Sequence, residues 1–382
     1  MSKVFNQANI YICLWCLYYM QGTLYEQGSI VSRTILLVLM IMSVLNVYLL
    51  NVKYKLPLYF KGLNILLGMF IVYGLALFVG GRYIPVGFSK ISYLQEILIS
   101  LLPIYSAYLY TRKGQITPRS LRLWIPIWFI VAITSFYFNK QLVIDSLVSD
   151  RVEITNNVAY SFVALMPVLV LYSKKPIIQF AFLLCCLVFV LLGMKRGAIL
   201  VAFVIFCWFV FRIIKLINGN KRIYVSILII AVVLIISAVV SSMLSTNEYF
   251  VIRLEQTMAG STSGRESLYS VFWSNFISEQ NFFRMMFGGG ANYTLALAGN
   301  YAHQDWLEIL TNQGLFGVAI YFYYFINFYF SWKFTRNNPI QYMAIGMLFI
   351  ISFMTSLFSM GYGNMEIYAT LTLGFFLAVS SR

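Results

Sequence analysis

Four ionisable side chains stand in short polar segments between long apolar stretches. Lys195 and Arg196 are neighbours in one segment, Arg265 lies in a second, and His303, the one histidine of the chain, lies in a third. Guanidinium groups are preferred partners of phosphate. An imidazole has an ordinary pKa of about 6.5, so it can take up a proton near neutral pH. These residue types suit the binding of a phosphorylated substrate and a proton transfer beside it.

The same residues also allow structural interpretations. Lys195 and Arg196 could anchor a turn at the membrane boundary by extending their charged ends into water. A lone histidine at the start of a helix is more often structural than catalytic. The run 288–290 consists of three glycines, which permit sharp turns and could cradle a phosphate, but no P-loop lysine follows it. The residues alone leave both interpretations open.

The composition predicts an all-α integral membrane protein. Of the 382 residues, 61% are hydrophobic and 10% are charged, and the mean hydropathy is +0.81. A soluble domain has about a quarter of its residues charged, so lipid must solvate most of this chain. Helices are required because lipid satisfies no backbone hydrogen bond of an open strand. We therefore expect residues 1–382 to form a single polytopic membrane domain.

Apolar stretches of about 20 residues predict about twelve transmembrane helices. The expected spans lie near 6–24, 30–50, 62–80, 92–110, 121–138, 156–172, 177–194, 197–215, 223–244, 305–330, 340–360 and 363–381. The five cysteines, Cys13, Cys16, Cys185, Cys186 and Cys207, fall inside these spans. This placement disfavours a disulfide framework and a zinc site.

The distribution of charge predicts the orientation. With twelve spans both termini lie on one side, and most of the 27 basic residues lie there, whereas all 12 acidic residues lie on the other. The positive-inside rule makes the terminal side cytoplasmic. The net charge of +15 is therefore a topology signal. The basic residues are dispersed over short turns, so they predict no nucleic-acid partner.

Two segments on the outer side are longer than simple connections. The smaller loop, 139–155, contains Arg151, and the large loop, 245–304, precedes the tenth span. Long loops in a compact architecture tend to be functional. Apolar residues at helical spacing in the large loop predict an amphipathic helix on the outer leaflet. These residues are Leu268, Val271, Phe272 and Phe276.

Three motifs, in their order along the chain, resemble the O-antigen polymerase and O-antigen ligase superfamily of bacterial envelope glycosyltransferases. They are Lys-Arg-Gly-Ala at 195–198, Ser-Gly-Arg at 263–265, and the glycine run followed by His303, Leu307-Glu308 and Gly314-x-x-Gly317. The resemblance covers about 150–320 best. Many members have an acid just before the first glycine of the last motif, where this chain has Gln313.

The resemblance implies transfer of a glycan from an undecaprenyl diphosphate carrier to a sugar hydroxyl, at the periplasmic face of the bacterial inner membrane. Arg196 and Arg265 would stabilise the departing diphosphate. Lys195 and Arg151 would assist them. His303 would act as the base toward the acceptor hydroxyl, with Glu308 as the second candidate.

We expect a polymerase that joins lipid-linked repeat units by direct, inverting transfer. No cofactor and no metal is expected, because no Asp-x-Asp pair occurs in the chain. The expected partners are the undecaprenyl-diphosphate-linked oligosaccharide, membrane lipid and, where present, a chain-length regulator protein. Two alternatives remain. One is an O-antigen ligase that transfers glycan to lipid A-core, and the other is a non-enzymatic transporter or flippase of lipid-linked glycans.

Overall fold

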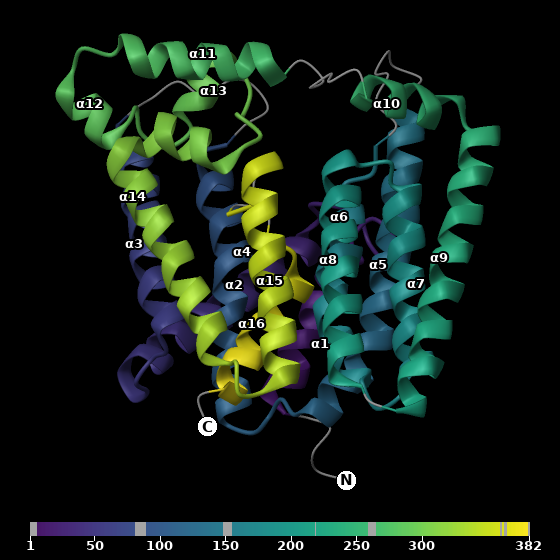
Figure 1. Cartoon of the computed structure of the whole chain (residues 1–382). Helices are drawn as coiled ribbons and strands as arrows, with labels where there is room; N and C mark the ends of the chain where they lie inside the picture. The colour runs from purple at the N-terminus through teal and green to yellow at the C-terminus, as the bar shows by residue number, and fades with distance from the viewer. Residues whose placement is uncertain are drawn as a thin grey trace.

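The computed structural model describes residues 6–80, 89–147, 155–217, 219–258, 265–359, 361–362 and 365–380. Within these ranges every element is a helix and no β-strand is present, which confirms the all-α prediction. Most helices run side by side along one direction, and a smaller group caps one end of the bundle (Figure 1).

In the described residues the bundle consists of twelve α-helices and one short 3-10 helix, η1. They are α1 (Gln7–Tyr19), α2 (Ile30–Lys53), α3 (Leu58–Val79), α4 (Lys90–Arg112), α5 (Pro118–Leu147), α6 (Ala159–Leu165), η1 (Met166–Tyr172), α7 (Pro176–Leu192), α8 (Arg196–Leu216), α9 (Asn220–Thr246), α14 (Asp305–Phe334), α15 (Pro339–Phe358) and α16 (Ile367–Ser380). Helix α1 begins and helix α16 ends at the same end of the bundle (Figure 1).

Seven of the described helices are long and apolar enough to cross a membrane, namely α2, α3, α5, α8, α9, α14 and α15. Three shorter apolar segments, formed by α6 with η1, by α7 and by α16, lie beside them. Every expected span contains a helix, but α1, α4 and the three shorter segments do not meet the length and composition of the seven. The count of twelve spans and the cytoplasmic placement of the termini therefore stay predictions.

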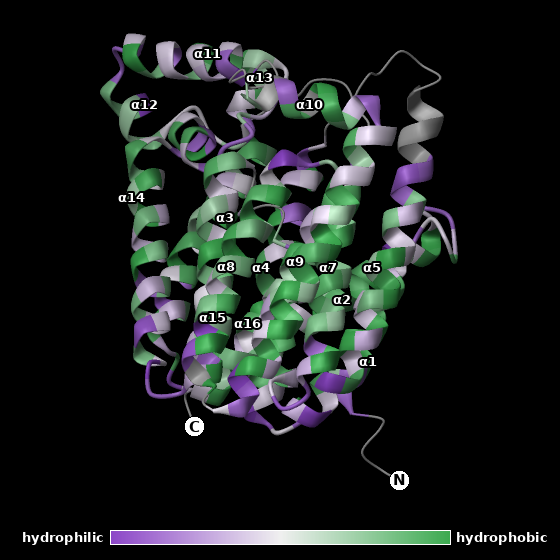
Figure 2. Ribbon diagram, turned by 45° about the vertical axis from the view of Figure 1, so that its right-hand side comes forward, coloured by the Kyte–Doolittle hydropathy of each residue, from purple (hydrophilic) through white to green (hydrophobic). Residues whose placement is uncertain are grey.

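The outer surface of the bundle is apolar. In the most apolar part of α9 only 11% of residues are buried within the protein, against 56% in α14. Figure 2 shows hydrophobic residues along the middle of the bundle and hydrophilic ones concentrated toward its two ends. A soluble monomer rarely exposes so large an apolar surface. The bundle is thus built to be solvated by lipid, and a larger share of α14 than of α9 is buried within the protein.

Four helices from the expected large loop form the cap over one end. They are α10 (Glu248–Met258), α11 (Arg265–Ser278), α12 (Phe282–Phe287) and α13 (Tyr293–Ala298). The expected helix is present as α11, whose inward residues recur at helical spacing, with Phe272 fully buried. Its outward side is also apolar in part, since Val271 and Trp273 are exposed. An amphipathic surface helix on the leaflet therefore stays a prediction.

The smaller expected loop is only partly described. Helix α5 continues through residue 147, so the first half of the range 139–155 is helical rather than irregular. Arg151 lies outside the described residues.

Helix α14 is interrupted at the point where the cap contacts it. Gly314 has a left-handed φ of 69° inside the helix, which interrupts the helical hydrogen bonds there. The carbonyls of Thr311 and Asn312 accept instead from the N–H groups of Gly289 and Gly290, at 3.0 and 2.7 Å. The N–H groups of Gly289 and Gly290 in the glycine run therefore donate to the backbone of α14. This arrangement leaves them unavailable for a phosphate.

Candidate active site

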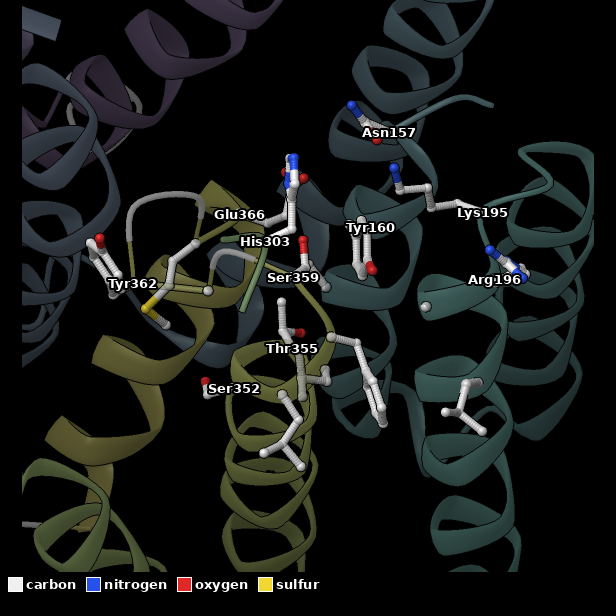
Figure 3. Close-up of a pocket in the computed structure, with 18 of the residues that line it drawn as sticks. Asn157, Tyr160, Lys195, Arg196, His303, Ser352, Thr355, Ser359, Tyr362 and Glu366 are labelled. Carbon is white, nitrogen blue, oxygen red and sulfur yellow. The ribbon is translucent and has the colours of Figure 1, made fainter. Parts of the chain in front are cut away.

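A pocket of about 1440 Å³ lies beneath the cap, between α4, α6, α8, α15 and the start of α16. Four sequence-predicted site residues line it together, although they come from three separate segments of the chain. They are Lys195, Arg196, Arg265 and His303. Two carboxylates, Glu96 and Glu366, also line the wall. Figure 3 shows Lys195 and Arg196 at the upper end of α8, with His303 and Glu366 nearer α15 and α16.

The cationic turn before α8 is held tightly against α6. The backbone N–H of Asn156 donates to the carbonyl of Gly193 at 2.9 Å. A Cβ atom on Gly197 would collide with the hydroxyl of Tyr160, so the glycine of the Lys-Arg-Gly motif has a steric reason. Met194 has a left-handed φ of 50°, which is uncommon for a residue other than glycine. The hydrogen bond to Asn156 and the close contact with Tyr160 therefore hold the turn in one particular backbone conformation.

Helix α8 adds its own electrostatic contribution at this turn. It begins at Arg196, directly after Lys195, and its first backbone N–H groups have no acceptor within the helix. The amino end of a helix carries a partial positive charge that favours anions. Two cationic side chains and a helix terminus thus coincide on the pocket wall, which is a suitable place for a phosphate group.

Arg265 is positioned by a contact between the cap and the bundle. It is the first residue of α11, and its Nη1 donates to the carbonyl of Phe358, the last residue of α15, at 2.8 Å. The guanidinium has further N–H groups that can bind a ligand. The Ser-Gly that precedes it in the motif lies outside the described residues.

His303 stands on the pocket wall in a strained conformation. Its φ is 54°, in the left-handed region that residues other than glycine seldom adopt. Such backbone persists only where neighbouring contacts hold it, and it gathers at functional sites. Gln304 follows as the N-cap of α14, and its side chain accepts from the N–H of Leu307 at 2.9 Å. The imidazole is thus placed by the start of the helix.

Tyr301 lies beside His303 on the same wall. Burial raises the pKa of its phenol, and the neighbouring carboxylates of Glu96 and Glu308 raise it further. The hydroxyl therefore stays protonated over the physiological pH range, so it can donate a hydrogen bond.

Glu308 is buried behind this wall and does not line the pocket. Its Oε2 accepts from the N–H of Ala302 at 2.6 Å. Its Oε1 accepts from the hydroxyl of Thr294 and from the amide of Asn312, the latter at 2.8 Å. These three donors occupy the carboxylate, so the geometry supports a positioning role beside His303. Its expected role as a second base stays a prediction.

A second buried carboxylate, Asp305, holds the segment between α15 and α16. It accepts from the N–H groups of Gly361 at 2.8 Å and Tyr362 at 3.2 Å, and from the hydroxyl of Tyr321 at 2.5 Å. The start of α14 thus fixes the histidine through Glu308 and the opposite segment through Asp305.

Sequence reasoning missed Glu366, which the same segment brings to the pocket. The available signal was its isolation, because it is the one acidic residue after Glu308 and stands at the start of the last apolar stretch. Gln313, the departure from the family pattern, is buried away from the pocket, and its Nε2 donates to the hydroxyl of Tyr93 at 3.2 Å. The absence of an acid at that position removes no carboxylate from the wall.

The pocket is polar under the cap and apolar along α8 and α9. Leu200 and Phe203 of α8 line it, yet 43% and 62% of their surface is exposed. This side of the pocket therefore opens at an apolar outer surface of the bundle. The arrangement can hold an amphiphile with an anionic head and an apolar tail.

The fold and this pocket define an all-helical multi-pass membrane protein. The O-antigen ligase family model matches residues 181–322, which contain the cationic turn, Arg265, His303 and Glu308. The match confirms the resemblance to the O-antigen polymerase and ligase superfamily and suggests a glycosyltransferase-like enzyme. No curated protein matches the chain.

Proposed function

We propose that this protein is a surface-polysaccharide polymerase of the O-antigen type in the bacterial inner membrane. It joins undecaprenyl-diphosphate-linked oligosaccharide repeat units at the periplasmic face. The observation that carries the proposal is the pocket itself. It gathers Lys195, Arg196, Arg265 and the one histidine of the chain beside an apolar wall that opens to lipid.

In the proposed reaction the cations hold the donor diphosphate. As the bond between the anomeric carbon and the phosphate oxygen breaks, negative charge grows on the diphosphate, and fixed cations stabilise that charge. The family match supports the lipid-linked donor, because the matched region contains Arg196 and Arg265. Arg151 stays an expected helper.

The acceptor sugar supplies the attacking hydroxyl. Its oxygen forms the new bond to the anomeric carbon, and its proton passes to the imidazole of His303. The lipid diphosphate leaves on the opposite face of the sugar, so the configuration inverts. This step requires no metal ion and no cofactor.

Reconstitution tests the polymerase directly. Purified protein in liposomes receives one lipid-diphosphate-linked repeat unit and no other acceptor, beside a His303→Ala variant. We expect a ladder of lengthening glycans that the variant does not make. Transfer that appears only after lipid A-core is added would instead identify a ligase. Movement of the lipid-linked unit across the bilayer without any transfer would identify a transporter.

A further inference from the structure

Glu366 is a carboxylate on the pocket wall that the proposed reaction does not yet use. It is the residue before α16, and its backbone carbonyl accepts from the N–H of Thr370 at 3.1 Å. Its Oε2 accepts from the hydroxyl of Ser161 at 2.8 Å. Among the described residues, Ser161 is the one hydrogen-bond partner of the Glu366 side chain, and no cation forms an ion pair with Glu366. A largely buried carboxylate without a cation is costly.

The position of Glu366 is fixed from several directions. The N–H of Met365 donates to the hydroxyl of Ser100 on α4 at 3.2 Å. Asp305 holds the other end of the segment through Gly361 and Tyr362. Ser161 then orients the side chain. Such anchoring is what a preorganised binding group requires, and it leaves Oε1 for a ligand.

The charges of the pocket are divided between its walls. Lys195 and Arg196 come from the start of α8, and Arg265 comes from α11. Glu366 and Glu96 come from the start of α16 and from α4, two helices that pack against each other. We call the part of the lining that α8 and α11 supply the cationic wall, and the part that α4 and the start of α16 supply the acidic wall.

The two walls suit different parts of the reacting pair. A diphosphate is negative and only accepts hydrogen bonds, so a carboxylate repels it and cations attract it. Sugar hydroxyls are neutral and both donate and accept hydrogen bonds, so a carboxyl group can pair with them without electrostatic repulsion. The acidic wall therefore fits the sugar that attacks and disfavours the diphosphate that leaves.

We propose that Glu366 binds the acceptor sugar, with Oε1 accepting a hydrogen bond from an acceptor hydroxyl while Ser161 holds Oε2. This inference rests on the proposed glycosyl transfer. It assigns the cationic wall to the donor and the acidic wall to the acceptor, with His303 lining the same pocket.

The test separates acceptor binding from donor binding in reconstituted full-length protein. Undecaprenyl diphosphate alone probes the donor site, and initial rates at varied concentrations of a soluble repeat-unit oligosaccharide give the acceptor KM. Glu366→Gln keeps the shape and the Ser161 contact but removes the charge. Glu26→Gln is the matched control, because Glu26 is exposed and does not line the pocket.

We expect Glu366→Gln to bind undecaprenyl diphosphate within about twofold of the unmodified protein and to raise the acceptor KM by about tenfold or more. Ser161→Ala keeps the carboxylate but loses its orientation, so a smaller rise is expected. If Glu366→Gln is poorly folded, Ser161→Ala decides the matter.

An acceptor KM equal to that of Glu26→Gln would overturn the inference while leaving the polymerase intact. A loss of diphosphate binding in Glu366→Gln, with an unchanged acceptor KM, would also overturn it. An unmodified protein that neither binds undecaprenyl diphosphate nor transfers sugar would overturn the proposed function and this inference together.

Discussion

The carboxylate of Glu308 accepts a hydrogen bond from the backbone N–H of Ala302 at 2.6 Å, one residue before the strained histidine. The bond spans the turn that leads into α14. It explains how His303 keeps a left-handed φ on the pocket wall, because the preceding peptide is fixed from inside the helix.

Glu308→Gln should therefore weaken the support of His303. The amide can accept at one oxygen only, so at least one buried donor is left unpaired, at a cost of about 1–3 kcal/mol. We expect a lower melting temperature, faster hydrogen exchange at residues 300–304 and reduced transfer. If Glu308 is instead a base that touches the substrate, transfer will fall while melting and exchange stay unchanged.

Asp305→Asn should loosen the segment that presents Glu366. The N–H groups of Gly361 and Tyr362 and the hydroxyl of Tyr321 all donate to this buried carboxylate. An asparagine leaves one of them facing an amide N–H₂ group, at a cost of about 1–3 kcal/mol. Hydrogen exchange of a peptide containing Gly361 and Tyr362 measures the effect. Tyr321→Phe removes a single donor and should perturb this peptide less; an equal effect would contradict the account.

Arg196→Ala should lose donor binding without unfolding the protein. Arg196 lines the pocket at the start of α8, so the dissociation constant for undecaprenyl diphosphate should rise by about tenfold or more. Arg212→Ala is the matched control on the same helix. Its guanidinium lies 4.6 Å from the ring centroid of Tyr342, away from the pocket. Similar affinities in the two variants would show that the cationic turn is structural.

Gly314→Ala should be strongly destabilising. A Cβ atom there would lie 2.5 Å from the backbone nitrogen of Gly288 and from the carbonyl oxygen of Met286. The backbone of Gly314, with φ 69° and ψ −164°, lies in a region essentially confined to glycine, which adds a cost of about 1–3 kcal/mol for any other residue. Gly68→Ala is the control, because Gly68 lies within α3 with open space around it, and helix propensity favours alanine by about 0.5–1 kcal/mol. Thermal unfolding in detergent compares them, and equal melting temperatures would contradict the proposed backbone contact.

The sequence by itself determined the helical membrane architecture, because each apolar stretch must satisfy its own backbone hydrogen bonds in lipid. It also singled out Arg196, Arg265 and His303, since their residue types stand out in polar segments between such stretches.

Only the tertiary structure decided which polar groups face the pocket. Glu308 follows Asp305 at a helix start and Glu366 stands alone before the last apolar stretch, but neither pattern tells which carboxylate faces the pocket. The carboxylate of Glu308 accepts hydrogen bonds from the turn and from its own helix. The carboxylate of Glu366 instead accepts from Ser161, which lies 205 residues away in the chain. Burial and hydrogen-bond partners depend on such long-range contacts, and local patterns do not contain them.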